Sequence, residues 1–365
     1  MTRYIVRRLL GAIPTLFIIS LLIYAILLAA PGGPEARFIN NPRVTAEAIA
    51  TFKAHWGLDQ PVYIQYCRWL GFCNPNGKGL GVFVSDHGAP NFVPGFIGGG
   101  DNGILHLDFG YSSANGTPVA DVIVERAPRT VVLAGTALVL WLLLAFLTGT
   151  IAAVKRYSKA DTAITIFNYV GYSFPTFWLG LLLIIIFVAQ LGWFPAGGMW
   201  NTRVVPIFGT PEYWAFFGSQ PFVALTDLVW HLALPVTTLV VVSVAGDSRF
   251  IRASMIDALR QDFVRTARAK GVPERRVIIR HALRNALLPV VTDIGLELPF
   301  LFTGAIATET VFSWPGMGQQ FLISVGNYDY PVLMGILVIT AVFVVGANLL
   351  ADIVYAIVDP RVSYG

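Results

Sequence analysis

The chain has 365 residues, of which 55% are hydrophobic and 13% are charged. The charged share is about half of the roughly 25% found in soluble domains, and a soluble fold of this size could not bury so much apolar surface. The formal net charge is +4, and no basic block is interleaved with exposed aromatic residues, which argues against nucleic-acid binding. Two cysteines are too few for a disulfide scaffold or a four-ligand zinc site, so composition predicts a membrane protein with no metal site.

Six segments are apolar enough, and close enough to about 20 residues in length, to span a bilayer. They cover residues 9–30, 130–154, 163–191, 228–244, 286–308 and 332–358. We interpret the first as an uncleaved span, because its apolar stretch is longer than the roughly 7–15 residues of a signal-peptide core. The expected fold is therefore an all-α membrane protein with six transmembrane helices.

The positions of lysine and arginine predict the orientation of these spans. Arg3, Arg7 and Arg8 precede the first span, and ten of the 25 lysine and arginine residues lie between residues 249 and 284. Positive charge gathers on the cytoplasmic side of membrane proteins, so both termini are expected in the cytoplasm. The domain organisation that follows is an N-terminal helical segment at 1–30, an external segment at 31–128 and a transmembrane core at 129–365.

Residues 248–288, between the fourth and fifth spans, are too polar to cross a membrane and too regular for a linker. Five residues of this loop recur at intervals of three or four positions, or lie next to each other, which predicts that they share one helical face. They are Met255, Leu259, Phe263, Thr266 and Ala267. Gly271 is expected to end this helix in a left-handed conformation, and Pro273 to open a second, basic and amphipathic helix over 274–287.

Two interpretations of this loop differ in what it binds. It is either a basic loop held by anionic lipid headgroups or a docking element for a cytoplasmic protein. Lipid attraction would need the positive charges but neither the small residues Ala267 and Ala269 nor the glycine turn. These residues therefore favour docking.

The segment FVRTARAKGVPERRVIIRHALRNALLP, residues 263–289, resembles the EAA coupling loop of ABC importer permeases. Arg265 stands where the general form of that loop has glutamate, whereas Ala267 and Gly271 match it. This form is typical of the dipeptide/oligopeptide/nickel branch of the family. Segments with the same resemblance are RYIVRRLLGAIPTLFIIS at 3–20, HWGLDQPVYIQYCRWL at 55–70, ETVFSWPGMGQQF at 309–321 and DIVYAIVDPRV at 352–362.

The resemblance implies the type I ABC importer permease fold in a bacterial inner membrane. It implies a subunit that moves dipeptides or oligopeptides by alternating access, beside a second homologous permease, two ABC ATPases and an external solute-binding protein. The chain lacks the phosphate-binding motif G-x-x-x-x-G-K-[ST], so it is expected to be no enzyme, with ATP and Mg bound by the ATPases. Nickel chelates, glutathione and oligosaccharides are alternative solutes. A proton-coupled secondary transporter is a remote alternative that would leave the coupling loop without a role.

The resemblance also assigns roles to particular residues. The expected ATPase-coupling residues are Phe263, Thr266, Ala267, Ala269, Lys270 and Gly271. Glu309, Pro315 and Gly316 match an outer turn, which Glu309 is expected to stabilise through Ser313 or backbone donors.

Two carboxylates fall inside the fifth predicted span, where ionisable groups are functional candidates. Asp293 and Glu297 are four residues apart and share a helical face, so they are candidates for the translocation path. The alternative is that partner helices or a shallow aqueous cavity satisfy them.

The external segment carries an unusual insertion at about 71–106, rich in glycine and asparagine. Cys67 and Cys73 flank its start, and outside the cytoplasm they are expected to form a disulfide, the alternative being two free thiols. The insertion is either a plain surface loop or a contact for the solute-binding protein.

Overall fold

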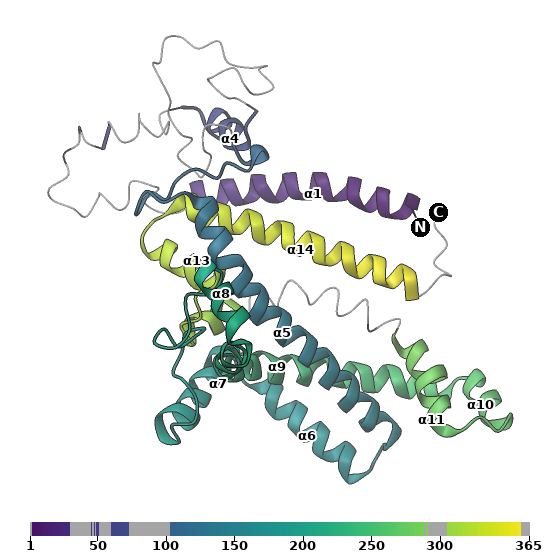
Figure 1. Ribbon diagram of the computed structural model, residues 1–365. Helices are drawn as coiled ribbons and strands as arrows, with labels where there is room; N and C mark the ends of the chain where they lie inside the picture. Colours follow the sequence, from purple (N-terminus) through teal and green to yellow (C-terminus); the bar gives the residue numbers. More distant parts are fainter. Residues whose placement is uncertain are drawn as a thin grey trace. The chain divides into compact units, whose positions relative to one another are not determined.

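The computed structural model describes residues 2–29, 60–72, 103–287 and 305–358, together with positions 45, 47, 49, 50 and 290. This part of the chain is mostly helical (Figure 1), and the β-bridge within it joins Tyr111 to Pro118. The chain divides into two compact units. The first comprises Met1–Arg8, Arg129–Gly318 and Gly346–Gly365, and the second comprises Leu9–Pro128 and Gln319–Val345.

Four helices in the described residues are long and apolar enough to cross a membrane. They are α1 (Thr2–Leu28), α5 (Val119–Val154), α9 (Pro221–Arg260) and α14 (Tyr330–Val358). They coincide with the first, second, fourth and sixth predicted spans, although α5 and α9 continue as helix well beyond their apolar stretches. The fifth predicted span, 286–308, lies mostly outside the described residues, so the total of six stays a prediction.

The third predicted span is not one straight helix. It is bent by 102° between α6 (Lys159–Ser173) and the pair α7 (Thr176–Leu183) and η2 (Ile184–Gln190), the last of which is π-helical. The cause is Pro175, which disfavours helical geometry in the residue before it, and Phe174 is accordingly extended with φ −92° and ψ 127°. The Phe174 ring stacks on Trp178 at 4.9 Å between centroids, which covers the break.

The core of the first unit is built mainly from one face of α5 and one face of α9. Its buried side chains include Leu133, Ala137, Trp141, Ala145, Val236, Val240, Val244 and Ile251. The two helices approach so closely at Gly149 that a β-carbon there would lie 2.7 Å from the Ser248 carbonyl oxygen. Thr148 and Ser248 share a hydrogen bond of 2.9 Å beside this point. Small residues let helices pack this tightly in a membrane, where close van der Waals contact drives their association.

In the second unit, α1 from Leu9 onward and α14 up to Val345 lie side by side (Figure 1), and α4 (Val62–Leu70) packs against them near one end. Tyr24 of α1, Trp69 of α4 and Met334 of α14 are buried together. Asp329, which is also buried, accepts hydrogen bonds from Ser112 and Ser113. The short helices of the chain are η1 (Ile104–His106), α8 (Pro211–Ser219), α10 (Asp262–Ala269), α11 (Glu274–Arg276), the π-helical η3 (Val277–Leu283) and α13 (Met317–Gly326).

Because of the close contact at Gly149, we expect alanine substitutions at Gly149 and at Gly135, both on α5, to affect thermal stability differently. Gly149→Ala is expected to lower the midpoint of thermal unfolding of the purified permease, because the new methyl group collides with the α9 backbone. Gly135→Ala is the matched control, since nothing lies within 4 Å of a β-carbon there. It should leave the midpoint unchanged or raise it, because alanine is about 1 kcal/mol better than glycine in a helix. Equal shifts for the two variants would contradict the packing described here.

Candidate functional site

The candidate site begins where α9 ends. Gln261 adopts an extended conformation, with φ −70° and ψ 152°, and separates α9 from α10. The prediction that Met255, Leu259 and Phe263 share the face of one continuous helix was therefore wrong. Met255 is buried within the core on α9, whereas Phe263 lies on the exposed side of the separate helix α10. No proline or glycine marks this break in the sequence.

α10 has an inner face and an outer face. Val264 and Ala267 are buried in the core cluster that also contains Val277 of η3, so the helix packs back on the chain that follows it. Four of the predicted coupling residues lie on the exposed side: Phe263, Thr266, Ala269 and Lys270. Phe263, at 38% exposure, is a large apolar side chain that α10 does not bury. Ala267 differs from the other predicted residues because its side chain serves the internal packing.

Gly271 makes the turn after α10. Its φ is +73°, and its N–H donates to the Arg268 carbonyl at 2.9 Å while the Val272 N–H donates to the Ala267 carbonyl at 3.2 Å. These two bonds around a left-handed residue form a Schellman motif, which satisfies the last carbonyls of the helix. Nothing lies within 4 Å of a β-carbon built on Gly271. The position is thus constrained by its backbone conformation and open on its side-chain side.

Arg268 and Glu274 form an ion pair across the turn. The guanidinium donates two hydrogen bonds to the carboxylate, at 2.6 and 3.1 Å, and both side chains are about half exposed. The hydrogen bonds from Arg268 lower the pKa of the Glu274 carboxyl. Since the ordinary pKa of glutamate is already far below neutral, the pair is fully charged at physiological pH.

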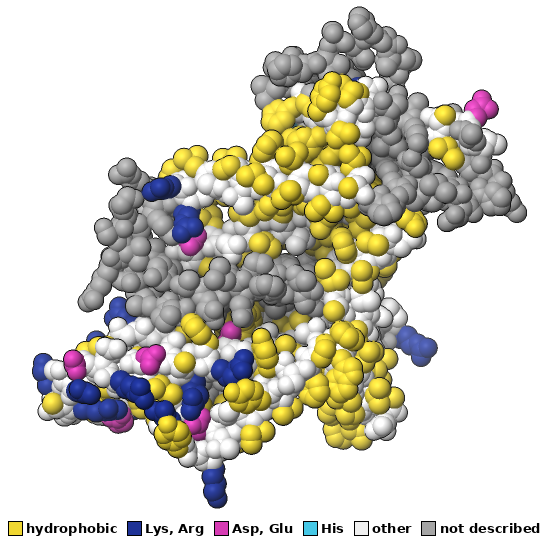
Figure 2. Space-filling model, turned by 180° about the vertical axis from the view of Figure 1, so that it is seen from behind, with side chains coloured by type: hydrophobic (Ala, Val, Ile, Leu, Met, Phe, Trp, Pro, Cys, Tyr) yellow, Lys and Arg dark blue, Asp and Glu magenta, His cyan; other side chains and the backbone are white. Residues whose placement is uncertain are grey.

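The chain returns through α11 and η3, and we call residues 262–287 the basic hairpin. The sequence predicted a regular amphipathic helix over 274–287, but its middle is π-helical. The wider π-helical turn places Val277 and Ala282, five residues apart, in the same buried cluster, which a regular helix would splay apart. Lysine and arginine side chains gather over this end of the first unit (Figure 2).

An ion pair with a buried carboxylate and a half-buried arginine joins the last turns of α9 to the start of α6. Arg252 donates to both oxygens of Asp161, each at 2.8 Å, and the Tyr157 N–H donates to the same carboxylate at 2.9 Å. The Asp161 side chain is 6% exposed. The pair joins the start of α6 to α9 across 91 positions in sequence. The sequence pattern did not predict this pair, although an aspartate in the first turn of a predicted span, with arginines at the end of another, was a signal for it.

The outer-turn residues form a second cluster in the first unit. Glu309 is 0% exposed, and its carboxylate accepts a hydrogen bond of 2.7 Å from Thr130 of α5. Thr130 Oγ1 in turn accepts the N–H of Met317 at 2.8 Å. A β-carbon at Gly316 would collide with the Glu309 carboxylate, so any other residue there would have to displace that carboxylate. Thr130 is one donor to Glu309 that the sequence did not identify.

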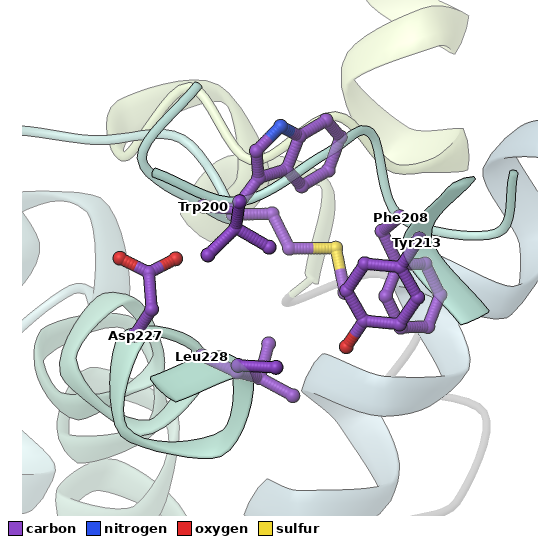
Figure 3. Close-up of a pocket in the computed structure, with 8 residues that line it drawn as sticks. Trp200, Phe208, Tyr213, Asp227 and Leu228 are labelled. Carbon is purple, nitrogen blue, oxygen red and sulfur yellow. The ribbon is translucent and has the colours of Figure 1, made fainter. Parts of the chain in front are cut away.

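A small cavity lies among residues 199–228, and Figure 3 shows Trp200, Phe208, Tyr213, Asp227 and Leu228 around it. Its volume is about 10 Å³, which is room for about one water molecule and far too little for a peptide. Asp227 accepts the Asn201 N–H at 3.0 Å. Burial raises the pKa of Tyr213, and the charge of Asp227 raises it further. The cavity is therefore part of the local packing of this segment.

Several predicted residues fall outside the part of the chain that the structure describes. Asp293 and Glu297 are among them, so their place on a translocation path stays a prediction. Cys67 of α4 is disulfide-bonded. Its predicted partner Cys73 lies outside the described residues. Within the described residues, no group of three or more histidine, cysteine, aspartate or glutamate side chains is arranged to hold a metal ion.

Comparison with known proteins places these features in a family. Residues 145–364 match the family described as "Binding-protein-dependent transport system inner membrane component", and residues 1–77 match the corresponding N-terminal family. A solved structure described as "Crystal structure of an amino acid ABC transporter with histidines" is 18% identical and covers 66% of this chain and 94% of its own, with a TM-score of 0.42.

Two curated relatives align with the whole chain. The oligopeptide transport system permease protein AppB of Bacillus subtilis (strain 168) is 39% identical over 365 residues, covering all of both chains. The glutathione transport system permease protein GsiC of Escherichia coli (strain K12) is 36% identical over 364 residues, with the same full coverage. This chain therefore belongs to the inner-membrane components of binding-protein-dependent transport systems, the permease subunits of ABC transporters.

Proposed function

We propose that this permease imports dipeptides or oligopeptides by alternating access, driven by separate ATPase subunits that bind the basic hairpin. The observation that carries this proposal is the division of α10 into a buried inner face and an exposed outer face. On the outer face, the side chains of Phe263, Thr266 and Ala269 are exposed. A short, rigid helix with one apolar side chain and several small ones suits a groove on a partner protein.

The connection between α10 and α9 gives the hairpin its mechanical role. Only Gln261 separates the two helices, and α9 runs for 40 residues from Pro221 to Arg260. When ATP draws the two ATPase subunits together, each carries its docked α10, and α9 transmits that movement into the membrane. Nucleotide must bind one of the two states more tightly than the other, because a ligand shifts an equilibrium only through differential affinity.

The assembly follows from the same argument. A second homologous permease completes the pathway, two ATPases bind ATP and Mg, and an external solute-binding protein delivers the solute. Both chain termini and the basic hairpin then lie in the cytoplasm of a bacterium, as the positions of lysine and arginine predict. The chain itself carries out no catalysis.

The names of the relatives support a peptide as the solute. One relative is named for oligopeptides and the other for glutathione, which is itself a small peptide. We place Asp293 and Glu297 on the translocation path, where their carboxylates would meet a peptide amino group. The pairing of Cys67 with Cys73 and the contact of the 71–106 insertion with the solute-binding protein belong to the same proposal. Glutathione, nickel chelates and oligosaccharides remain the alternative solutes.

The proposed energy source can be tested with the complete transporter in proteoliposomes. Uptake of a radiolabelled dipeptide is expected to require ATP inside the vesicle and an active ATPase, and to persist when an uncoupler removes the proton gradient. An ATPase variant that binds but does not hydrolyse ATP should abolish uptake. Uptake that fails with the uncoupler and survives the ATPase variant would establish a proton-driven transporter instead.

Gly271→Glu is expected to abolish ATP-dependent uptake while the protein still inserts into the membrane. The new side chain would stand in the open space beside the turn, where the ATPase is proposed to sit. Gly209→Glu is the matched control, because Gly209 also has a positive φ, of +92°, and nothing within 4 Å of its β-carbon. Uptake rates normalised to membrane abundance measure the difference. A Gly271→Glu transporter with normal uptake would remove the coupling role.

Glu274→Gln is expected to reduce uptake far less than Gly271→Glu. A half-exposed ion pair contributes at most about 1 kcal/mol, because water and salt screen it. The sign of the pH effect follows from the lowered pKa of Glu274. The contribution is fully present above the ordinary glutamate pKa and is lost as pH falls through the lower folded-state value. Uptake by the wild-type and Glu274→Gln transporters should therefore have the same pH profile between about pH 6 and pH 8.

A further inference from the structure

The returning limb of the basic hairpin carries a surface that the proposed coupling role does not use. Its buried residues are Val277, Ala282 and Ala286, and its other side is exposed. We call this exposed side the arginine face, and it consists of Arg275, Arg276, Ile279, Arg280 and Arg284. Ile279 is 52% exposed although it is a large apolar side chain in the middle of four cations.

The charge of this surface is of one sign. Glu274 is the acidic residue nearest to the arginine face in sequence, and Arg268 of the opposite limb already binds it. Within the described part of the chain, none of the four arginines of the face forms an ion pair with an acidic side chain. The outer side of α10 is different, because its charges are mixed and Asp262 binds Arg265 there. The two limbs therefore present different chemistry.

We propose that the arginine face rests on the anionic phospholipid headgroups of the cytoplasmic leaflet, while the outer face of α10 binds the ATPase. The inference rests on the proposed function, which places the hairpin in the cytoplasm. Arginine forks bind phosphate oxygens in pairs, so a row of them matches a layer of phosphate groups. A cluster of four or more such cations directly beside a membrane span is typical of contact with anionic lipid.

Ile279 and the chain connections support lipid over a second protein surface. An apolar side chain among cations is the pattern of a segment that lies in the interface, with its apolar group below the headgroups. Both ends of the hairpin are tied to the membrane, because α9 enters it from one span and residue 286 begins the fifth predicted span.

The test uses single cysteines in the complete transporter, because the described residues contain no free cysteine. Ile279→Cys is labelled with an environment-sensitive fluorophore, and Thr266→Cys on α10 carries the same label as the matched control. The transporter is placed in nanodiscs of phosphatidylcholine alone or of phosphatidylcholine with phosphatidylglycerol, both containing a lipid with a nitroxide near its headgroup. ATPase subunits are then removed and restored.

The proposal expects the label at 279 to be quenched by the nitroxide lipid, more strongly with phosphatidylglycerol, and to be indifferent to the ATPase. The label at 266 should respond to the ATPase and not to the lipid. Protection of position 279 by the ATPase, with no lipid quenching, would make the arginine face part of the protein interface and overturn the proposal. An unresponsive label at 266 would instead count against the proposed function, so the two failures are distinguishable.

Arg276→Gln combined with Arg280→Gln provides a second measurement on the same face. These substitutions should remove the preference of position 279 for phosphatidylglycerol while ATPase binding to the detergent-purified complex stays unchanged. Arg265→Gln, on α10, is the control that also removes an exposed arginine of the hairpin. Loss of ATPase binding in the double variant, with the lipid preference retained, would overturn the assignment.

Discussion

The close packing of α9 against α5 and α6 is the constraint on which the rest of the first unit depends. Gly149 admits the α9 backbone, Thr148 bonds to Ser248, and Arg252 is held by both oxygens of Asp161. These contacts lie along the part of α9 that leads into the basic hairpin. A helix fixed in this way moves as a rigid body, because tightly packed interfaces pass from one arrangement to another and do not bend continuously. In the proposed mechanism, a movement of the hairpin would therefore reach the membrane through a shift of α9 as a whole.

Packing and backbone conformation contribute more than charge to the stability of the basic hairpin. Val264, Ala267 and Val277 are buried together, and Gly271 closes the turn in a conformation that costs other residues about 1–2 kcal/mol. The ion pair across the turn is half exposed and contributes less than this. The fold of the hairpin therefore depends little on its exposed charges, so these charges are available to bind partners. Their arrangement, mixed on α10 and of one sign on the returning limb, is the basis for proposing two different partners for the two limbs.

The parts of the fold that the sequence predicts well depend on local signals. Apolar length identifies α1, α5, α9 and α14, and the pair Gly271 and Pro273 identifies the turn of the hairpin. The bend at Phe174 also had a local signal, which is Pro175. Predicting spans from the number of apolar residues does not detect it, because proline interrupts the helix without adding charge. The break at Gln261 had none. It arises because Val264 and Ala267 must face the core from a helix whose direction differs from that of α9, and tertiary packing overrides local preference there.

The polar partners in the candidate site show where local reasoning ends. Thr130 and Glu309 are 179 positions apart, and Arg252 and Asp161 are 91 apart, so no spacing rule connects them. Each is nonetheless required by the same physical condition, because a buried carboxylate needs donors and each carboxylate lies on a helix end facing another helix. In both cases the sequence identifies the acidic residue, and the burial of its carboxylate requires a hydrogen-bond donor. Which donor meets that demand is decided by the helix that packs opposite, and here that helix is α5 for the outer turn and α9 for the approach to the hairpin.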